Sequence, residues 1–204
     1  MKIYKKVSGL LPVNSYFIVN EDLNEGFVID GGTSAKGVLD FAKEKGFTLT
    51  AMLLTHTHFD HASCTKDLQN AGVKVYVSEQ ESDGLSNKTI NLSDRFFISF
   101  ESTVADKTFA NGEEFSLCGI AVKALITPGH SKGSACFLIG DNLFTGDTLM
   151  CETIGRTDLP TGDMDTLIKT LNRIKNFDKD YKIFAGHGED TTLSHEKIYN
   201  PFLV

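Results

Sequence analysis

Two kinds of segment alternate along the chain, and they differ in the spacing of their hydrophobic and polar residues. Short apolar runs of strand length are followed by stretches in which apolar residues recur every three to four positions, as on one face of a helix. The apolar runs predict strands over 14–19, 26–30, 49–55, 73–77, 115–117, 120–126, 135–139, 142–144 and 182–185. The helical stretches predict helices over 34–45, 62–71, 164–175 and 195–199.

Both halves of the chain therefore combine helices with several strands. No repeat or linker divides the 204 residues, so we expect one domain over residues 1–204. Two facing sheets with helices on their outer sides would bury the apolar faces, which predicts an α/β (α+β) fold as a four-layer αββα sandwich. Segment 87–107 has no clean periodicity, and we expect it to form loops and short helices over a cleft.

Composition narrows the class of protein. The net charge is −7 and no long basic cluster is present, which disfavours nucleic-acid binding. No apolar run reaches the length of a membrane span, and segment 1–6 lacks an apolar stretch typical of a signal peptide, so we expect a cytoplasmic protein. The four cysteines form no CxxC pair, and we expect them to be buried thiols rather than disulfides or metal ligands: Cys64, Cys118, Cys136 and Cys151.

The segment from Thr55 to His61 carries three histidines and one aspartate where a predicted strand meets a helix. His56 and His58 are two residues apart, so an extended backbone places both side chains on one face. Asp60 and His61 begin the helix and point in another direction. Imidazole and carboxylate groups are preferred ligands of Zn²⁺ and similar cations. A solvated loop capped by Asp60 would explain the carboxylate but not three histidines.

Three further candidate ligands follow predicted strands and stand beside glycines: His130, Asp147 and His187. Taken singly, His130 is typical of an exposed turn and Asp147 of a turn or helix cap. Next to the first cluster, both are better explained as ligands that complete a metal site. His195 lies within the last predicted helix, and we expect it at the surface.

Two metal ions about 3.5–4 Å apart would use all these side chains. Zn²⁺ is the expected metal, with Fe and Mn as alternatives. Each ion would keep one coordination position open, as catalytic sites require. The candidates divide into three ligands for one ion, three for the other and one bridging residue: His56, His58 and His130; Asp60, His61 and His187; and Asp147.

Together these motifs resemble the metallo-β-lactamase superfamily in its dinuclear hydrolase form. The resemblance covers nearly the whole chain and implies an αββα sandwich. It also assigns Asp30, at a predicted strand end, a supporting role next to the ligands. The resemblance rests on four motifs in chain order: His-x-His-x-Asp-His at 56–61, Gly-His130, Gly-Asp147 and Gly-His187-Gly.

Further residues indicate a branch of that superfamily. Asp147 stands where the best-known zinc β-lactamases carry a cysteine, and Asp60 matches the glyoxalase II type. Segments 155–163 and 186–192 resemble the small, single-domain, hydroxyacylglutathione hydrolase-like enzymes of bacteria. Glyoxalase II proper has an additional C-terminal helical segment that supplies cations for glutathione. The chain stops at Val204 without this segment, so the resemblance leaves the thiol part of the substrate open.

The resemblance implies hydrolysis of thioesters such as S-(hydroxyacyl)glutathione. A hydroxide that bridges the two metal ions would attack the carbonyl carbon, with Asp60 orienting it as a catalytic residue. Lys132 and Arg156 are candidates to bind an anionic small-molecule substrate. A solvated surface charge is the alternative interpretation of both, and it applies more to Lys132 than to Arg156.

The main alternative is a persulfide dioxygenase that binds one iron through His56, His130 and Asp147. Such relatives also carry a Gly-Arg-Thr-Asp segment, but they lack an equivalent of His187, which favours the dinuclear hydrolase. Hydrolysis of another ester, a lactam or a phosphodiester, and metal binding without catalysis, are the remaining alternatives. The sequence does not specify the oligomeric state.

Overall fold

The computed structural model describes residues 1–203. Within this range the strands form two six-stranded sheets, in the orders β1-β2-β3-β4-β5-β6 and β12-β11-β10-β9-β8-β7. The first sheet contains β1 (Lys2–Ser8), β2 (Val13–Asn20), β3 (Glu25–Ile29), β4 (Thr48–Leu53), β5 (Lys74–Ser78) and β6 (Lys107–Phe109). The second contains β7 (Glu114–Leu117), β8 (Ile120–Ile126), β9 (Ala135–Ile139), β10 (Asn142–Gly146), β11 (Lys182–Ala185) and β12 (Thr191–Thr192).

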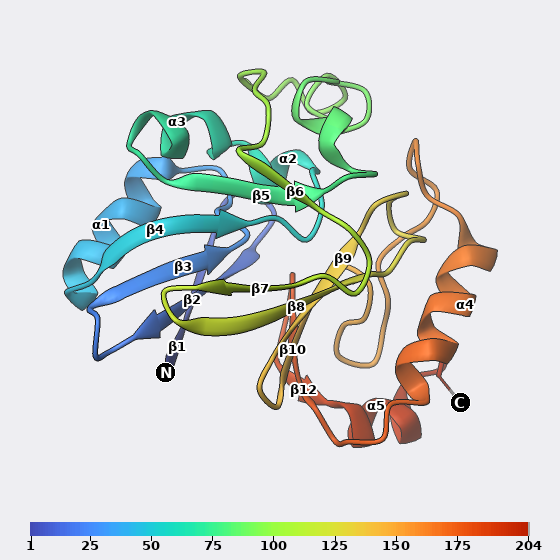
Figure 1. Ribbon diagram of the computed structural model, residues 1–204. Helices are drawn as coiled ribbons and strands as arrows, with labels where there is room; N and C mark the ends of the chain where they lie inside the picture. Colours follow the sequence, from blue (N-terminus) through green and yellow to red (C-terminus); the bar gives the residue numbers. More distant parts are fainter. Residues whose placement is uncertain (204) are drawn as a thin grey trace.

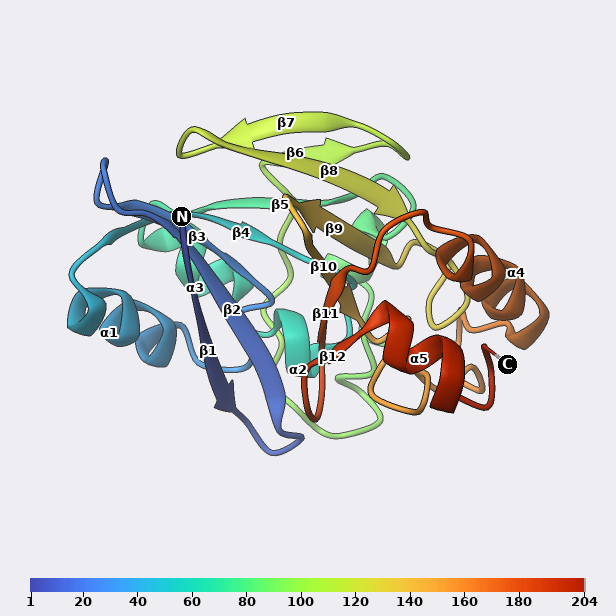
Figure 2. The same cartoon turned by 90° about the horizontal axis from the view of Figure 1, so that it is seen from below.

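Helices cover the outer face of each sheet. Figures 1 and 2 show α1 and α3 beside the first sheet, and α4 and α5 beside the second. This arrangement confirms the predicted four-layer αββα sandwich. The helical elements of the described residues are α1 (Ala35–Lys45), α2 (Phe59–Ala62), α3 (Thr65–Asn70), the 3-10 turn η1 (Ser82–Leu85), α4 (Met164–Lys175) and α5 (Leu193–Tyr199).

Apolar side chains fill the three spaces between the four layers. Phe27 and Leu53 of the first sheet pack between the sheets with Phe137 and Phe144 of the second. A second cluster joins α1 and α3 to the outer face of the first sheet, and a third joins α4 to the outer face of the second. The inner strands are therefore buried on both faces, which explains why many of them are continuous apolar runs.

The two sheets meet at the ends of the strands that carry the candidate ligands. Strands β3 and β4 are parallel, as are β10 and β11, so their carboxyl ends lie at the same edge. Backbone hydrogen bonds join the two sheets at this edge, from Ala135 N to Thr55 O (2.8 Å) and from Asn14 N to Gly186 O (2.7 Å). The loops after β4, β8, β10 and β11 therefore converge.

Three predictions of secondary structure need correction. The helix predicted over 62–71 begins only at Thr65, as α3, and the separate short helix α2 ends at Ala62. Between them the Cys64 N–H donates to Gly32 O (3.3 Å), so it does not continue the helical ladder. The last helix begins at Leu193 rather than at residue 195. Segment 87–107 forms turns without a helix before β6 begins. None of the helices in residues 1–203 has both the length and the apolar character needed to cross a bilayer.

Candidate metal centre

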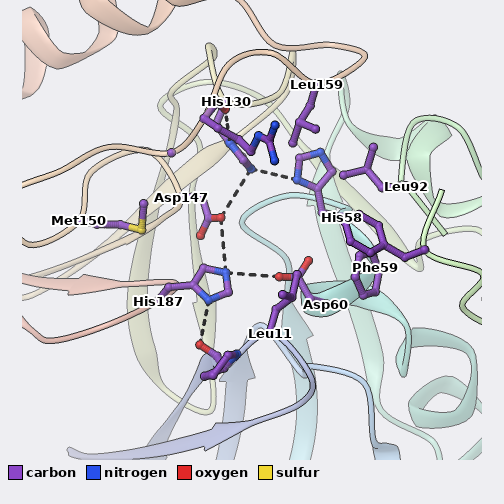
Figure 3. A pocket seen from close by; sticks show the side chains of 14 residues that line it. Leu11, His58, Phe59, Asp60, Leu92, His130, Asp147, Met150, Leu159 and His187 are labelled. Atoms are coloured by element: carbon purple, nitrogen blue, oxygen red, sulfur yellow. Dashed lines mark hydrogen bonds and ion pairs between the residues drawn. The ribbon is translucent and has the colours of Figure 1, made fainter.

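All seven predicted ligands come together where the two sheets meet. Five of them surround one cavity in Figure 3, where His58 and His130 lie at one end and His187 and Asp60 at the other. The donor atoms within each of three overlapping groups lie within 4.8 Å of one another. These groups are His56, His58 and His130; His56, His61 and Asp147; and Asp60, His61 and His187.

The first group has the spacing of ligands around one ion. His130 Nε2 lies 2.9 Å from His58 Nδ1 and 3.3 Å from His56 Nε2. Two Zn–N bonds of about 2.0–2.1 Å at a tetrahedral angle place their nitrogens about 3.3 Å apart. The nitrogens of His56, His58 and His130 therefore fit a divalent cation.

The second group has a similar spacing. His61 Nε2 lies 3.2 Å from His187 Nε2, and Asp60 Oδ2 lies 3.3 Å from the same His187 atom. Asp147 stands between the two groups, with Oδ2 3.6 Å from His130 Nε2 and 3.5 Å from His187 Nε2. Among the described residues, Asp147 Oδ1 is one of three buried side-chain nitrogen or oxygen atoms without a hydrogen-bond partner. A cation bound beside Asp147 would satisfy this oxygen.

Three of the histidines are oriented by hydrogen bonds from the ring nitrogen that faces away from the centre. His130 Nδ1 donates to Arg156 O (2.7 Å), and His187 Nδ1 donates to Pro12 O (2.8 Å). A proton on Nδ1 leaves the Nε2 lone pair free to face the centre. His61 Nδ1 is held in the same way by the carboxylate of Asp30, at 2.9 Å. The rings are therefore oriented for ligation by the protein itself.

Asp30 lies where the resemblance predicted a supporting carboxylate. Its side chain is buried, with 1% of its surface exposed. Besides His61, it accepts hydrogen bonds from Thr55 N (2.9 Å) and Thr55 Oγ1 (2.8 Å). Thr55 Oγ1 also lies 3.0 Å from His56 Nδ1. Asp30 thus connects the end of β4 to ligands of both groups.

Glu81 is a second supporting carboxylate, which was not among the predicted site residues. It is fully buried, and its Oε1 accepts hydrogen bonds from Thr57 N (3.1 Å) and Thr57 Oγ1 (2.9 Å). Its Oε2 accepts from Ser131 Oγ (2.9 Å) and Gly133 N (2.9 Å). Thr57 lies between two ligands and Ser131 follows a third, so Glu81 joins the two loops that form the first group. Glu81 stands among polar residues typical of a surface turn, so no local pattern marks it.

Two glycines allow the ligands to approach closely. A Cβ atom at Gly186 would lie 2.3 Å from Asp147 Oδ1. A Cβ atom at Gly155 would lie 2.0 Å from Asp147 O and 2.8 Å from His130 Nδ1. Any side chain at either position would displace a candidate ligand.

The electrostatics of the cluster also fit a cation. Burial, together with neighbouring imidazoles, lowers the pKa of His56 and His58 well below the usual value, so both are neutral ligands. Burial disfavours charge on His61 as well, but Asp60, Asp147 and Asp30 raise the pKa of His61 to about 10. In the metal-free protein these carboxylates therefore favour a proton on His61, and a bound cation would replace that proton.

The remaining candidates lie outside this cluster. Arg156 lines the cleft above it, but its guanidinium forms two 2.6 Å hydrogen bonds to Asp158. Lys132 does not line the cleft, and its Nζ lies 2.6 Å from Asp83 Oδ2. Their role in substrate binding stays a prediction. His195 lies outside the cleft and bonds to the exposed Glu152 at 2.9 Å. The four cysteines of the described chain are free thiols, but only Cys64 and Cys136 are buried as predicted, whereas Cys118 and Cys151 are partly exposed.

Comparison with known proteins agrees with this geometry. The profile of the Metallo-beta-lactamase superfamily matches residues 8–187. The chain is 36% identical to a probable metallo-hydrolase of Streptococcus pyogenes, over 99% of this chain and 90% of the relative. It is 32% identical to a hydroxyacylglutathione hydrolase of Haemophilus influenzae, over 95% of this chain and 96% of the relative.

Solved structures show the same similarity. The crystal structure of BLEG-1, described as a B3 metallo-β-lactamase, matches with a TM-score of 0.93 and 30% identity over 100% of both chains. TTHA1623, crystallised in a di-iron-bound form, matches with a TM-score of 0.86 and 28% identity, over 98% of this chain and 100% of the other. From the sequence match and the shared architecture, we conclude that the chain belongs to the metallo-β-lactamase superfamily.

Proposed function

We propose that this protein is a dinuclear metal-dependent hydrolase of thioesters, with Zn²⁺ as its metal. One observation carries the proposal: two groups of ligand atoms lie on either side of the partly buried carboxylate of Asp147, beneath an open cleft. The relative named as a hydroxyacylglutathione hydrolase supports thioesters as the substrate class.

The ligand set would hold two ions, and the chain's own residues would position the reactants around them. When bound, the ions would lower the pKa of water and polarise a carbonyl group. Asp60 faces the cleft, where its carboxylate would accept a hydrogen bond from the attacking water and orient that water. A thiolate is a good leaving group, so the reaction needs no strong acid from the protein.

A direct test compares the metal-loaded protein with its His58→Ala variant on S-lactoylglutathione and on simpler thioesters. We expect the variant to lose at least 100-fold in kcat, because it lacks one of three ligands in the first group. His195→Ala, which changes a histidine outside the centre, should keep the wild-type rate. Equal rates for the wild type and His58→Ala would refute the assigned role of the centre.

Hydrolysis of β-lactams is a second candidate, because BLEG-1 is described as a metallo-β-lactamase and matches both chains over their full length. The same panel should therefore include a penicillin and a cephalosporin. Faster hydrolysis of a lactam than of every thioester would favour this candidate.

The mononuclear dioxygenase is less well supported by the geometry. Its iron would use only His56, His130 and Asp147 and would leave the ordered second group without a function. One iron per chain, with oxygen consumption on addition of glutathione persulfide, would favour the dioxygenase instead.

A further inference from the structure

The cleft above the metal centre has apolar walls. Its volume is about 320 Å³, at the lower end of the range for small-molecule sites. Figure 3 shows Leu92, Leu159 and Phe59 together beside His58, and Met150 on the other side of Asp147. A substrate bound at the metal centre would therefore have apolar side chains on both sides of its reacting carbon.

Apolar groups also form the mouth of the cleft. Phe96 and Leu11 line it and remain 40% and 38% exposed. The Phe96 ring packs on that of Phe59, with centroids 4.9 Å apart, so the aromatic wall continues from the buried floor to the surface. Large apolar side chains that stay exposed around a cleft are typical of a surface that binds an apolar ligand.

The cleft, by contrast, has almost no unpaired positive charge. Among residues 1–203, Arg156 is the only lysine or arginine that lines the cleft, and Asp158 holds its guanidinium through two hydrogen bonds. Arg95 lines a neighbouring hollow that shares only Leu92 with the cleft. A substrate carboxylate away from the metals would therefore meet a guanidinium whose charge Asp158 already balances.

From these apolar walls and paired charges we infer that the cleft prefers thioesters with an apolar, uncharged group on both sides of the reacting carbonyl. Such esters should be better substrates than glutathione esters. This inference rests on the proposed hydrolysis and narrows its substrate class. In the reaction, a water oxygen bonds to the carbonyl carbon and the C–S bond breaks. The products are a carboxylic acid, which releases its proton, and a free thiol.

The test uses the metal-loaded protein and two sets of thioesters. The first set carries lactoyl or butanoyl groups on glutathione or on N-acetylcysteamine, and the second adds the acetyl and propanoyl esters of N-acetylcysteamine. We expect kcat/KM for butanoyl-N-acetylcysteamine to exceed that for S-lactoylglutathione at least tenfold. From acetyl to butanoyl, each added methylene should raise kcat/KM about fourfold, since burying one contributes about 0.8 kcal/mol. A higher kcat/KM for the glutathione ester of either acyl group would overturn the inference.

Failure of the proposed function would look different, because then no thioester would be hydrolysed. Binding supplies a readout that does not depend on turnover. We expect calorimetry to show tighter binding of S-butyl-N-acetylcysteamine, a thioether that cannot be hydrolysed, than of S-butylglutathione. The reverse order would overturn the inference even in an active enzyme.

Two variants test whether Phe96 and the Arg156–Asp158 ion pair determine the substrate preference. Phe96→Ala should reduce the preference for butanoyl over acetyl esters at least threefold. Its matched control is Phe97→Ala, because Phe97 is 95% exposed and does not line the cleft.

Asp158→Asn should free Arg156 and raise kcat/KM for S-lactoylglutathione relative to the neutral ester. An unchanged chain-length preference in Phe96→Ala, or an unchanged ratio in Asp158→Asn, would contradict the inference.

Discussion

At the scale of single residues, two buried carboxylates support the candidate ligands. Asp30 holds His61, and Glu81 joins Thr57 to Ser131. The ligands themselves were predictable because histidines at strand ends, next to glycines, form a local pattern. Glu81 was not predictable, since its partners lie 24 and 50 residues away and only folding brings them together.

Replacement of Glu81 should loosen the first ligand group. In Glu81→Gln, the new amide would supply donors where Ser131 and Gly133 also donate, leaving a buried donor unpaired. We expect the affinity for the first zinc ion to fall about 10- to 100-fold, the usual effect of losing a partner that orients ligands. Competition with a chromogenic chelator measures this affinity.

The matched control for this variant is Glu79→Gln, which changes an exposed glutamate two residues away. It should bind zinc as the wild type does. Wild-type affinity in Glu81→Gln would show that the buried carboxylate does not position the ligands.

At the scale of elements, apolar periodicity predicted the inner strands and the long helices but missed three edge strands. Strand β1 mixes lysines with apolar residues, β6 has only three residues and β12 only two threonines. All three depend on pairing with a neighbouring strand, which local pattern does not reveal. Helix α1 was predicted from residue 34, and Ser34 proves to be its N-cap, accepting a hydrogen bond from Gly37 N at 3.1 Å.

Loss of this cap should destabilise the fold measurably. We expect Ser34→Ala to lower the free energy of unfolding by about 1 kcal/mol, and Ser34→Gly by only a few tenths, because glycine is well tolerated at an N-cap. Urea denaturation of the metal-free proteins measures both values. If Ser34→Ala were as stable as the wild type, the cap would contribute nothing to the stability of α1.

At the scale of the whole molecule, the candidate metal centre lies between the two sheets. Its first four candidate ligands follow β4 of the first sheet, whereas His130, Asp147 and His187 follow strands of the second. The backbone bonds at Thr55 and Asn14 also join the sheets, so we expect the metal-free chain to remain folded.

Bound metal should therefore stabilise the whole sandwich. At a free zinc concentration about 1,000 times Kd, one site adds about 4 kcal/mol to the free energy of unfolding. We expect urea unfolding to show at least this gain over protein treated with chelator. Variants that lack a ligand, such as His187→Ala, should show a smaller gain. An unchanged unfolding midpoint on addition of zinc would contradict a centre that connects the sheets.

Both ligand groups should hold an ion at the same time, with Asp147 between the two ions. Metal analysis of zinc-loaded, desalted protein measures how many ions one chain binds. We expect two zinc ions per chain in the wild type. One ion per chain, or none, would rule out the dinuclear centre.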